Sequence, residues 1–206
     1  MENQAKTEEH VTSQKNKELH GYMQFVMDVI KKPHSILSTD YKGYHSYGLI
    51  TIIAFLSLIV IRSFSYQLKL HLQNDYIDTK FISSFQDFFA FFTTPLTLAA
   101  VLALIIVSFK WYAGEKEGKK LTTNYFLEKL GALLVPSAIL YATSIPLALL
   151  DISVGSWLSS VAYTFLYVAI FLVSYLFVAR DNLKVAAVFL FAFYMIDNVI
   201  GLIITL

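Results

Sequence analysis

Apolar residues are gathered into five long runs, which dominate the pattern of hydrophobic and polar positions along the chain. The runs cover Tyr44–Ile61, Phe88–Phe109, Gly131–Leu150, Trp157–Val178 and Lys184–Leu206. Each supplies about the 20 mostly apolar residues that a helix needs to cross a bilayer. We therefore expect an all-α protein, a polytopic bundle of five transmembrane helices joined by polar connections.

Lysine and arginine residues are unevenly distributed between these runs. The N-terminal segment carries six, and the second and fourth connections carry five and two. The first connection carries three, whereas the third connection and the C-terminus carry none. Alternate segments therefore hold thirteen basic residues on one side and three on the other. Because basic loops stay in the cytoplasm, this asymmetry predicts a cytoplasmic N-terminus and an extracytoplasmic C-terminus.

Two regions of different character precede the membrane domain, which we place at residues 44–206. Residues 1–17 are polar and mixed in charge, so they bury too little surface to offset ordering entropy and are expected to form a disordered cytoplasmic tail. Residues 18–43 form a juxtamembrane segment in which apolar side chains recur at helical spacing. These side chains are Leu19, Tyr22, Met23, Val26, Val29 and Ile30. We predict an amphipathic helix that ends near Lys32, because the residue before a proline is biased away from the helix.

Two positions are open to this helix. It could lie flat in the inner membrane interface, with Lys31 and Lys32 on anionic head groups at about 1 kcal/mol each. It could instead pack on the cytoplasmic ends of the bundle. The first span after it has a short apolar core, so we expect its flanking tyrosines to enter the interface and Arg62 to snorkel outward.

The third apolar run contains two prolines, Pro136 and Pro146. Each is expected to kink the helix, because proline frees a backbone carbonyl that neighbouring helices or hydroxyls must satisfy in a membrane. Ala138 and Ala142 form a pair of small residues that permits close helix approach. These features favour a central position in the bundle for the third helix.

Asp197 is the only acidic residue inside an apolar run. An ionised carboxylate there costs about 2.5–3.5 kcal/mol on insertion scales, so it must be protonated, paired or hydrated. Tyr194 and Asn198 lie beside it, and candidate donors on other helices are Tyr141, Tyr163 and Tyr167. Asp197 could form a proton or cation site, or a polar staple that fastens the fifth helix to the third and fourth. A single carboxylate makes a poor ion pathway, which favours the staple.

Several kinds of chemistry have no basis in this sequence. The absence of cysteine excludes disulfides, thiolate metal sites and cysteine nucleophiles. The five histidines lie outside the cores of the apolar runs and form no recognised metal-ligand motif. No catalytic or phosphate-binding motif occurs, and a net charge of +1 gives no reason to expect nucleic-acid binding. We therefore expect no catalytic residue, no metal and no cofactor.

The chain has a polar tail, an amphipathic segment with the element Val29-Ile30-Lys31-Lys32-Pro33, and five closely connected spans. Over about residues 20–206 this layout resembles bacterial members of the Yip (Ypt-interacting protein) superfamily. Eukaryotic members act in vesicle trafficking and bind small GTPases, but their Asp-Leu-Tyr-Gly-Pro element is absent here, so GTPase binding is not implied. Without cysteine, the chain also lacks the zinc-binding tail of some bacterial relatives. The resemblance implies a multi-pass protein of a bacterial plasma membrane.

These features lead to two main functional hypotheses. The first is a non-enzymatic membrane protein that organises the bilayer or binds a cytoplasmic or membrane protein partner through residues 1–43 and 113–120. The second is a small transporter or permease subunit that uses the polar site around Asp197. A sensor that reports the state of the membrane to a cytoplasmic partner is a third hypothesis.

Overall fold

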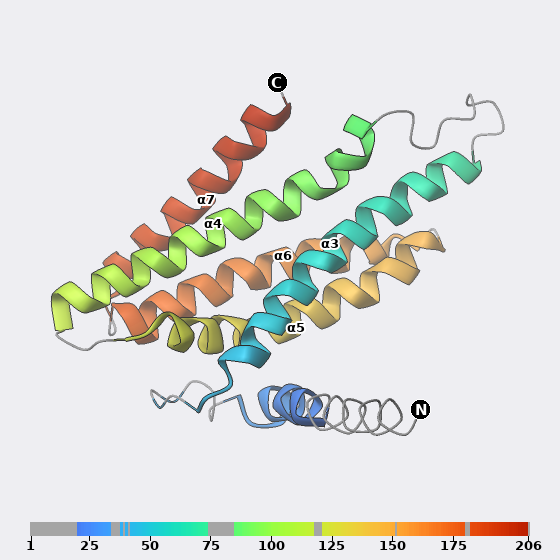
Figure 1. Cartoon of the computed structure of the whole chain (residues 1–206). Coiled ribbons are helices and arrows are strands. Elements are labelled where there is room, and N and C mark those ends of the chain that lie inside the picture. Colours follow the sequence, from blue (N-terminus) through green and yellow to red (C-terminus); the bar gives the residue numbers. More distant parts are fainter. Residues whose placement is uncertain are drawn as a thin grey trace, which may run out of the picture.

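Figure 1 shows the computed structural model of the chain. It describes residues 20–33, 38, 40, 42–73, 85–117, 121–150, 152–179 and 182–205, and within these ranges every regular element is a helix. The predicted tail at residues 1–17 lies outside the described residues, as do residues 118–120 of the predicted contact loop.

Long helices follow one another from residue 45 onward, and successive helices run in opposite directions (Figure 1). They are α3 (His45–Gln73), α4 (Phe85–Glu117), α5 (Thr123–Leu149), α6 (Val154–Val173) with its π-helical extension η1 (Ser174–Val178), and α7 (Leu183–Thr205). Five stretches are long and apolar enough to cross a membrane: His45–Lys69, Phe91–Gly114, Thr123–Leu149, Val154–Val178 and Leu183–Ile200. The predicted all-α bundle with five spans is confirmed.

Helices α3, α5 and α6 form the tightly packed part of the bundle. A Cβ atom added at Gly131 of α5 would collide with the backbone of Gly48 in α3, so the two helices cross where neither has a side chain. A Cβ at Gly155 of α6 would lie 2.6 Å from the amide nitrogen of Ala148 in α5. We expected Ala138 and Ala142 to permit close helix approach. In the structure these glycines provide it, and Ala142 is exposed.

Helix α5 starts eight residues before the predicted boundary at Gly131. Its N-cap is Thr122, whose hydroxyl accepts a hydrogen bond from the Tyr125 amide at 3.3 Å. The helix then continues through Pro136 and Pro146 to Leu149 without interruption. Between the prolines, the Ser137 hydroxyl donates to the carbonyl oxygen of Ala162 at 2.6 Å, which fastens α5 to α6.

We call the end of the bundle at which α3, α5 and α7 begin the tail end, and the opposite end the far end. Aromatic residues such as Phe109 and Phe126, 5.8 Å apart between ring centroids, fill the core towards the tail end. Helix α7 is the least buried span, and the side chains of Val188 and Phe191 are exposed on it. Exposed apolar surface of this kind is what a lipid-facing helix presents.

Candidate functional site

The predicted site around Asp197 is assembled in part. The Tyr167 hydroxyl of α6 donates to Asp197 Oδ2 of α7 at 3.2 Å, and the Tyr167 and Tyr194 rings lie 6.1 Å apart between centroids. Asn198 is exposed, and its side-chain amide donates to the Tyr194 carbonyl of the same helix at 2.7 Å. The structure therefore brings together Asp197, Tyr167 and Tyr194, whereas Asn198 is bonded to its own helix.

Tyr141 belongs to different surroundings. Its ring packs edge-on against Phe55 and Tyr163, with centroids 5.6 and 5.9 Å away, and the Arg62 guanidinium carbon lies 5.6 Å from its centroid. Among the described contacts, Asp197 is linked to α6 and not to α5. A staple formed by Asp197 would therefore fasten the fifth span to the fourth span, and not to the third.

An apolar groove of about 340 Å³ lies beside the Asp197 site, between α6 and α7. Tyr167 and Tyr194 form part of its wall, together with Phe171, Ala187, Leu190 and Phe191. The carboxylate of Asp197 is not among the groups that line it. In the described part of the chain, the Asp197 site thus consists of one carboxylate and the phenols of Tyr167 and Tyr194 next to an apolar surface.

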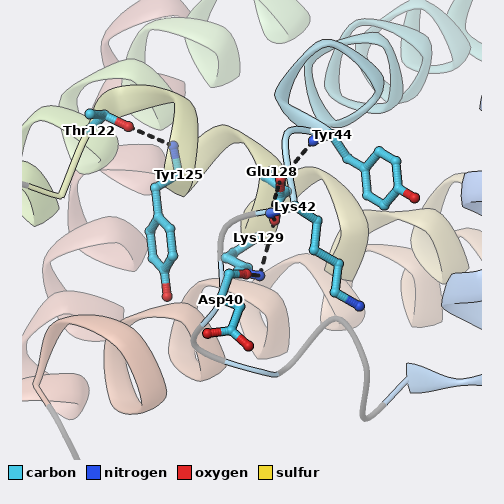
Figure 2. Close-up of polar contacts among 7 residues, drawn as sticks. All are labelled: Asp40, Lys42, Tyr44, Thr122, Tyr125, Glu128 and Lys129. Carbon is cyan, nitrogen blue, oxygen red and sulfur yellow. Dashed lines mark hydrogen bonds and ion pairs between the residues drawn. The ribbon is translucent and has the colours of Figure 1, made fainter.

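A second polar cluster, which the sequence did not predict, lies at the tail end of the bundle (Figure 2). Glu128 and Lys129, adjacent on α5, have side chains only 2% and 1% exposed, and their charged atoms lie 3.1 Å apart. Glu128 accepts hydrogen bonds from the backbone amides of Tyr44 at 2.7 Å and Lys42 at 3.2 Å. Lys129 Nζ donates to the Asp40 carbonyl at 2.8 Å. Both charges therefore hold the segment at residues 40–44 that leads into α3.

The Lys129 ammonium also lies near two aromatic rings. Its Nζ is 5.4 Å from the centroid of Tyr125 on α5 and 5.8 Å from that of Phe177 in η1. Cation–π attraction adds to the hydrogen bonds at such distances. We call Glu128, Lys129 and the backbone groups of Asp40, Lys42 and Tyr44 the tail-end clamp; it joins α5, the entry to α3 and the end of α6.

The position of Lys129 differs from the sequence expectation. It was counted as a basic residue of a cytoplasmic loop, but it lies inside α5 because Thr122 starts that helix early. Without it, the charge asymmetry is still twelve basic residues against three. The signal that could have located the clamp is an acid–base dipeptide placed directly before an apolar run.

Residues 20–31 form a helix that lies across the tail end of the bundle (Figure 1). Phe25 is 1% exposed and packs with Val29 against Ala132 and Val135 of α5. The Tyr22 hydroxyl is 3.2 Å from Thr51 Oγ1 of α3. Of the two positions left open by the sequence, the structure shows packing on the bundle.

The apolar face predicted for this helix differs from the face that is buried. Phe25, its most buried residue, was missing from the predicted face, whereas Met23 and Ile30, which were included, are more than half exposed. Lys31 and Lys32 are exposed at the end of the helix and are available for the predicted head-group contact. The helix therefore has more than one apolar side.

At the far end of the bundle, the Arg62 side chain contacts α5 and the start of α6. Its Nη1 donates to Ser144 Oγ at 2.7 Å and to the Gly155 carbonyl at 3.3 Å. Lys69, two turns further along α3, donates to the Ala148 carbonyl at 3.1 Å. The apolar run of α3 by itself does not reveal these acceptors, and the snorkelling of Arg62 stays a prediction.

Among the residues that the structure describes, no group of three or more His, Cys, Asp or Glu side chains is placed to hold a metal ion. No family model, curated protein or solved structure matches the chain. The assignment to a polytopic membrane protein therefore stands on the five long apolar helices themselves.

Proposed function

We propose that this chain is a non-catalytic integral membrane protein that holds the helix of residues 20–31 in the membrane interface and thereby organises the bilayer surface. The observation that carries the proposal is that this helix has three distinct sides. A helix held against a bundle at a membrane surface meets protein, lipid and water on three different sides. A helix surrounded by water on its free sides needs no second apolar row.

The three sides follow from 3.6 residues per turn. Phe25 and Val29 face the bundle and are buried. A second apolar row is exposed and consists of Met23, Met27 and Ile30, which are 55%, 42% and 53% exposed. The remaining side is polar and exposed, and it carries His20, Gln24 and Lys31. The exposed apolar row supports insertion among lipids, in which such side chains are stabilised.

The depth of the helix supports the same conclusion. Tyr22 contacts Thr51, six residues after α3 begins at His45, which corresponds to about 9 Å along the α3 axis. With His45 at the outer edge of a head-group layer, which is about 5–8 Å thick, the contact lies near the border between head groups and hydrocarbon. The tail-end clamp holds the connection at residues 40–44, so the helix has little freedom to leave this level. Lys31 and Lys32 would then reach anionic head groups.

Single-cysteine labelling tests this proposal cleanly, because the chain contains no cysteine. A nitroxide at Met27→Cys in liposomes should collide more with oxygen, which is enriched in lipid, than with a water-soluble nickel chelate. Gln24→Cys, on the polar side of the same helix, is the matched control and should show the opposite preference. If both labels prefer the nickel chelate, the exposed apolar row is not in lipid and the proposal fails.

The bilayer-organising role is part of the first functional hypothesis drawn from the sequence, and we propose it without GTPase binding. A protein partner would meet the same end of the chain, at residues 1–43 and 113–120. The basic-residue asymmetry supports a cytoplasmic tail end and an extracytoplasmic C-terminus, and the resemblance to bacterial Yip proteins implies a bacterial plasma membrane as the location. Labelling of cysteines introduced at both termini would contradict this orientation if both react from one face.

The alternative function is a small transporter or permease subunit. The specific observation in its favour is the Tyr167–Asp197 hydrogen bond next to an apolar groove within the spans. Asp197→Asn distinguishes the two functions, because it removes a proton site while keeping hydrogen-bonding capacity. Unchanged transport at an unchanged protein level would exclude the transporter, and loss of assembly would favour the structural staple.

A further inference from the structure

A cavity of about 420 Å³ opens at the far end of the bundle, between the end of α3, the end of α5 and the start of α6. Arg62 and Lys69 line it, and none of its described lining residues is acidic. Its volume falls within the range of small-ligand pockets, about 300–1,000 Å³. We propose that this cavity binds a phosphate group, carried by an anionic phospholipid or present as free phosphate.

Arg62 is held in a position suited to this task. The two bonds from Nη1 to Ser144 and Gly155 fix the guanidinium at the cavity wall, and the Tyr141 ring supports it. A guanidinium carries five N–H donors, and the three on Nη2 and Nε make no hydrogen bond within the described part of the chain. A planar set of donors of this kind suits phosphate oxygens.

Hydroxyl groups and a helix start complete the polar wall. Ser153, the residue before α6, makes no side-chain cap hydrogen bond, and it lines the cavity together with Ser156 in the first turn. The amides at the start of a helix carry partial positive charge and favour an anion. The Arg62 guanidinium carries the proposal, and Lys69 and the start of α6 add to the same polarity.

The other wall and the depth of the cavity fit a lipid head group. Ile145, Leu149 and Ile152 give it an apolar side. Measured from Thr51 at the near polar border, Lys69 lies eighteen residues further, about 27 Å along α3, while a bilayer core is about 30 Å thick. The cavity therefore lies where the phosphates of the far leaflet begin, and it is also accessible from water on that side.

Thermal unfolding of the full chain in nanodiscs tests the proposal. Nanodiscs of phosphatidylcholine are compared with and without phosphatidylglycerol, and separately with added inorganic phosphate. Lys69→Gln removes one cation, and Ser156→Asp puts a carboxylate at the cavity while suiting the first turn of a helix. The matched controls make the same charge changes at the tail end: Lys110→Gln on α4, and Asn124→Asp in the first turn of α5.

In the wild type, we expect phosphatidylglycerol or phosphate to raise the unfolding midpoint, and K69Q to weaken binding about fivefold. S156D should abolish the rise, whereas K110Q and N124D should keep it. A rise with phosphatidylglycerol alone assigns the site to a lipid head group, and a rise with inorganic phosphate alone assigns it to free phosphate. No rise with either ligand, or equal losses in the control variants, would overturn the proposal.

Discussion

Glu128→Gln tests the tail-end clamp directly. The substitution keeps the shape of the side chain but removes the charge that Lys129 faces at 3.1 Å. One carboxylate oxygen becomes an amide nitrogen, which cannot accept a hydrogen bond, so either the Tyr44 amide or the Lys129 ammonium loses its acceptor. Because both side chains are almost completely buried, removing one partner leaves an uncompensated charge. We expect the free energy of unfolding to fall by about 3–5 kcal/mol.

The measurement is unfolding of the purified chain in mixed micelles, together with proteolysis at the tail end to detect release of residues 20–31. Lys129→Met combined with E128Q leaves no buried charge, so the double variant should recover at least about 1 kcal/mol relative to E128Q alone. Lys184→Gln, an exposed lysine at the start of α7, is the control and should change stability by less than about 0.5 kcal/mol. An E128Q variant as stable as K184Q would refute the reasoning.

Two further predictions concern helix packing within the spans. Gly131→Ala should destabilise the bundle by about 1–3 kcal/mol, because its Cβ would meet the Gly48 backbone. Gly114→Ala, in open space on α4, should be neutral or slightly stabilising in the same unfolding assay, and equal effects would contradict the α3–α5 crossing. Tyr167→Phe should cost only about 0.6 kcal/mol, typical of one hydrogen bond between membrane helices, and a loss above about 2 kcal/mol would show that Asp197 carries more than this bond.

The five spans could be predicted because a membrane helix is specified by its own length and apolarity, independently of its neighbours. The start of α5 could not be predicted, because charged residues such as Glu128 and Lys129 are typical of a loop unless their hydrogen-bond partners are known. Those partners, Asp40, Lys42 and Tyr44, are 84 to 89 residues away in the sequence. The adjacent charges form a local pattern, but the distant backbone groups that complete their hydrogen bonds leave none.

The candidate sites also contain contacts that the sequence could predict and contacts that it could not. Tyr167 was a correct partner for Asp197 because both lie near the middle of neighbouring antiparallel spans. Tyr141 was wrong because its contacts depend on the rotation of α5 about its axis, which spacing alone does not determine. The contact between Arg62 and Ser144 also depends on the rotation of α5, so it could not be predicted from the sequence.

The charged groups at the two ends are arranged reciprocally on α3 and α5. At the tail end, the charged side chains Glu128 and Lys129 belong to α5, and their backbone partners belong to the entry to α3. At the far end, the charged side chains Arg62 and Lys69 belong to α3, and their partners, Ser144 and the Ala148 carbonyl, belong to α5. Apolar contact alone does not drive helices together in lipid, so close packing and directed hydrogen bonds must hold this pair. Among the described hydrogen bonds, the one from Tyr167 to Asp197 joins the side chains of α7 to another helix, and the surface of α7 is largely exposed. It should therefore be the first span to separate when the bundle loosens, while α3 and α5 stay paired.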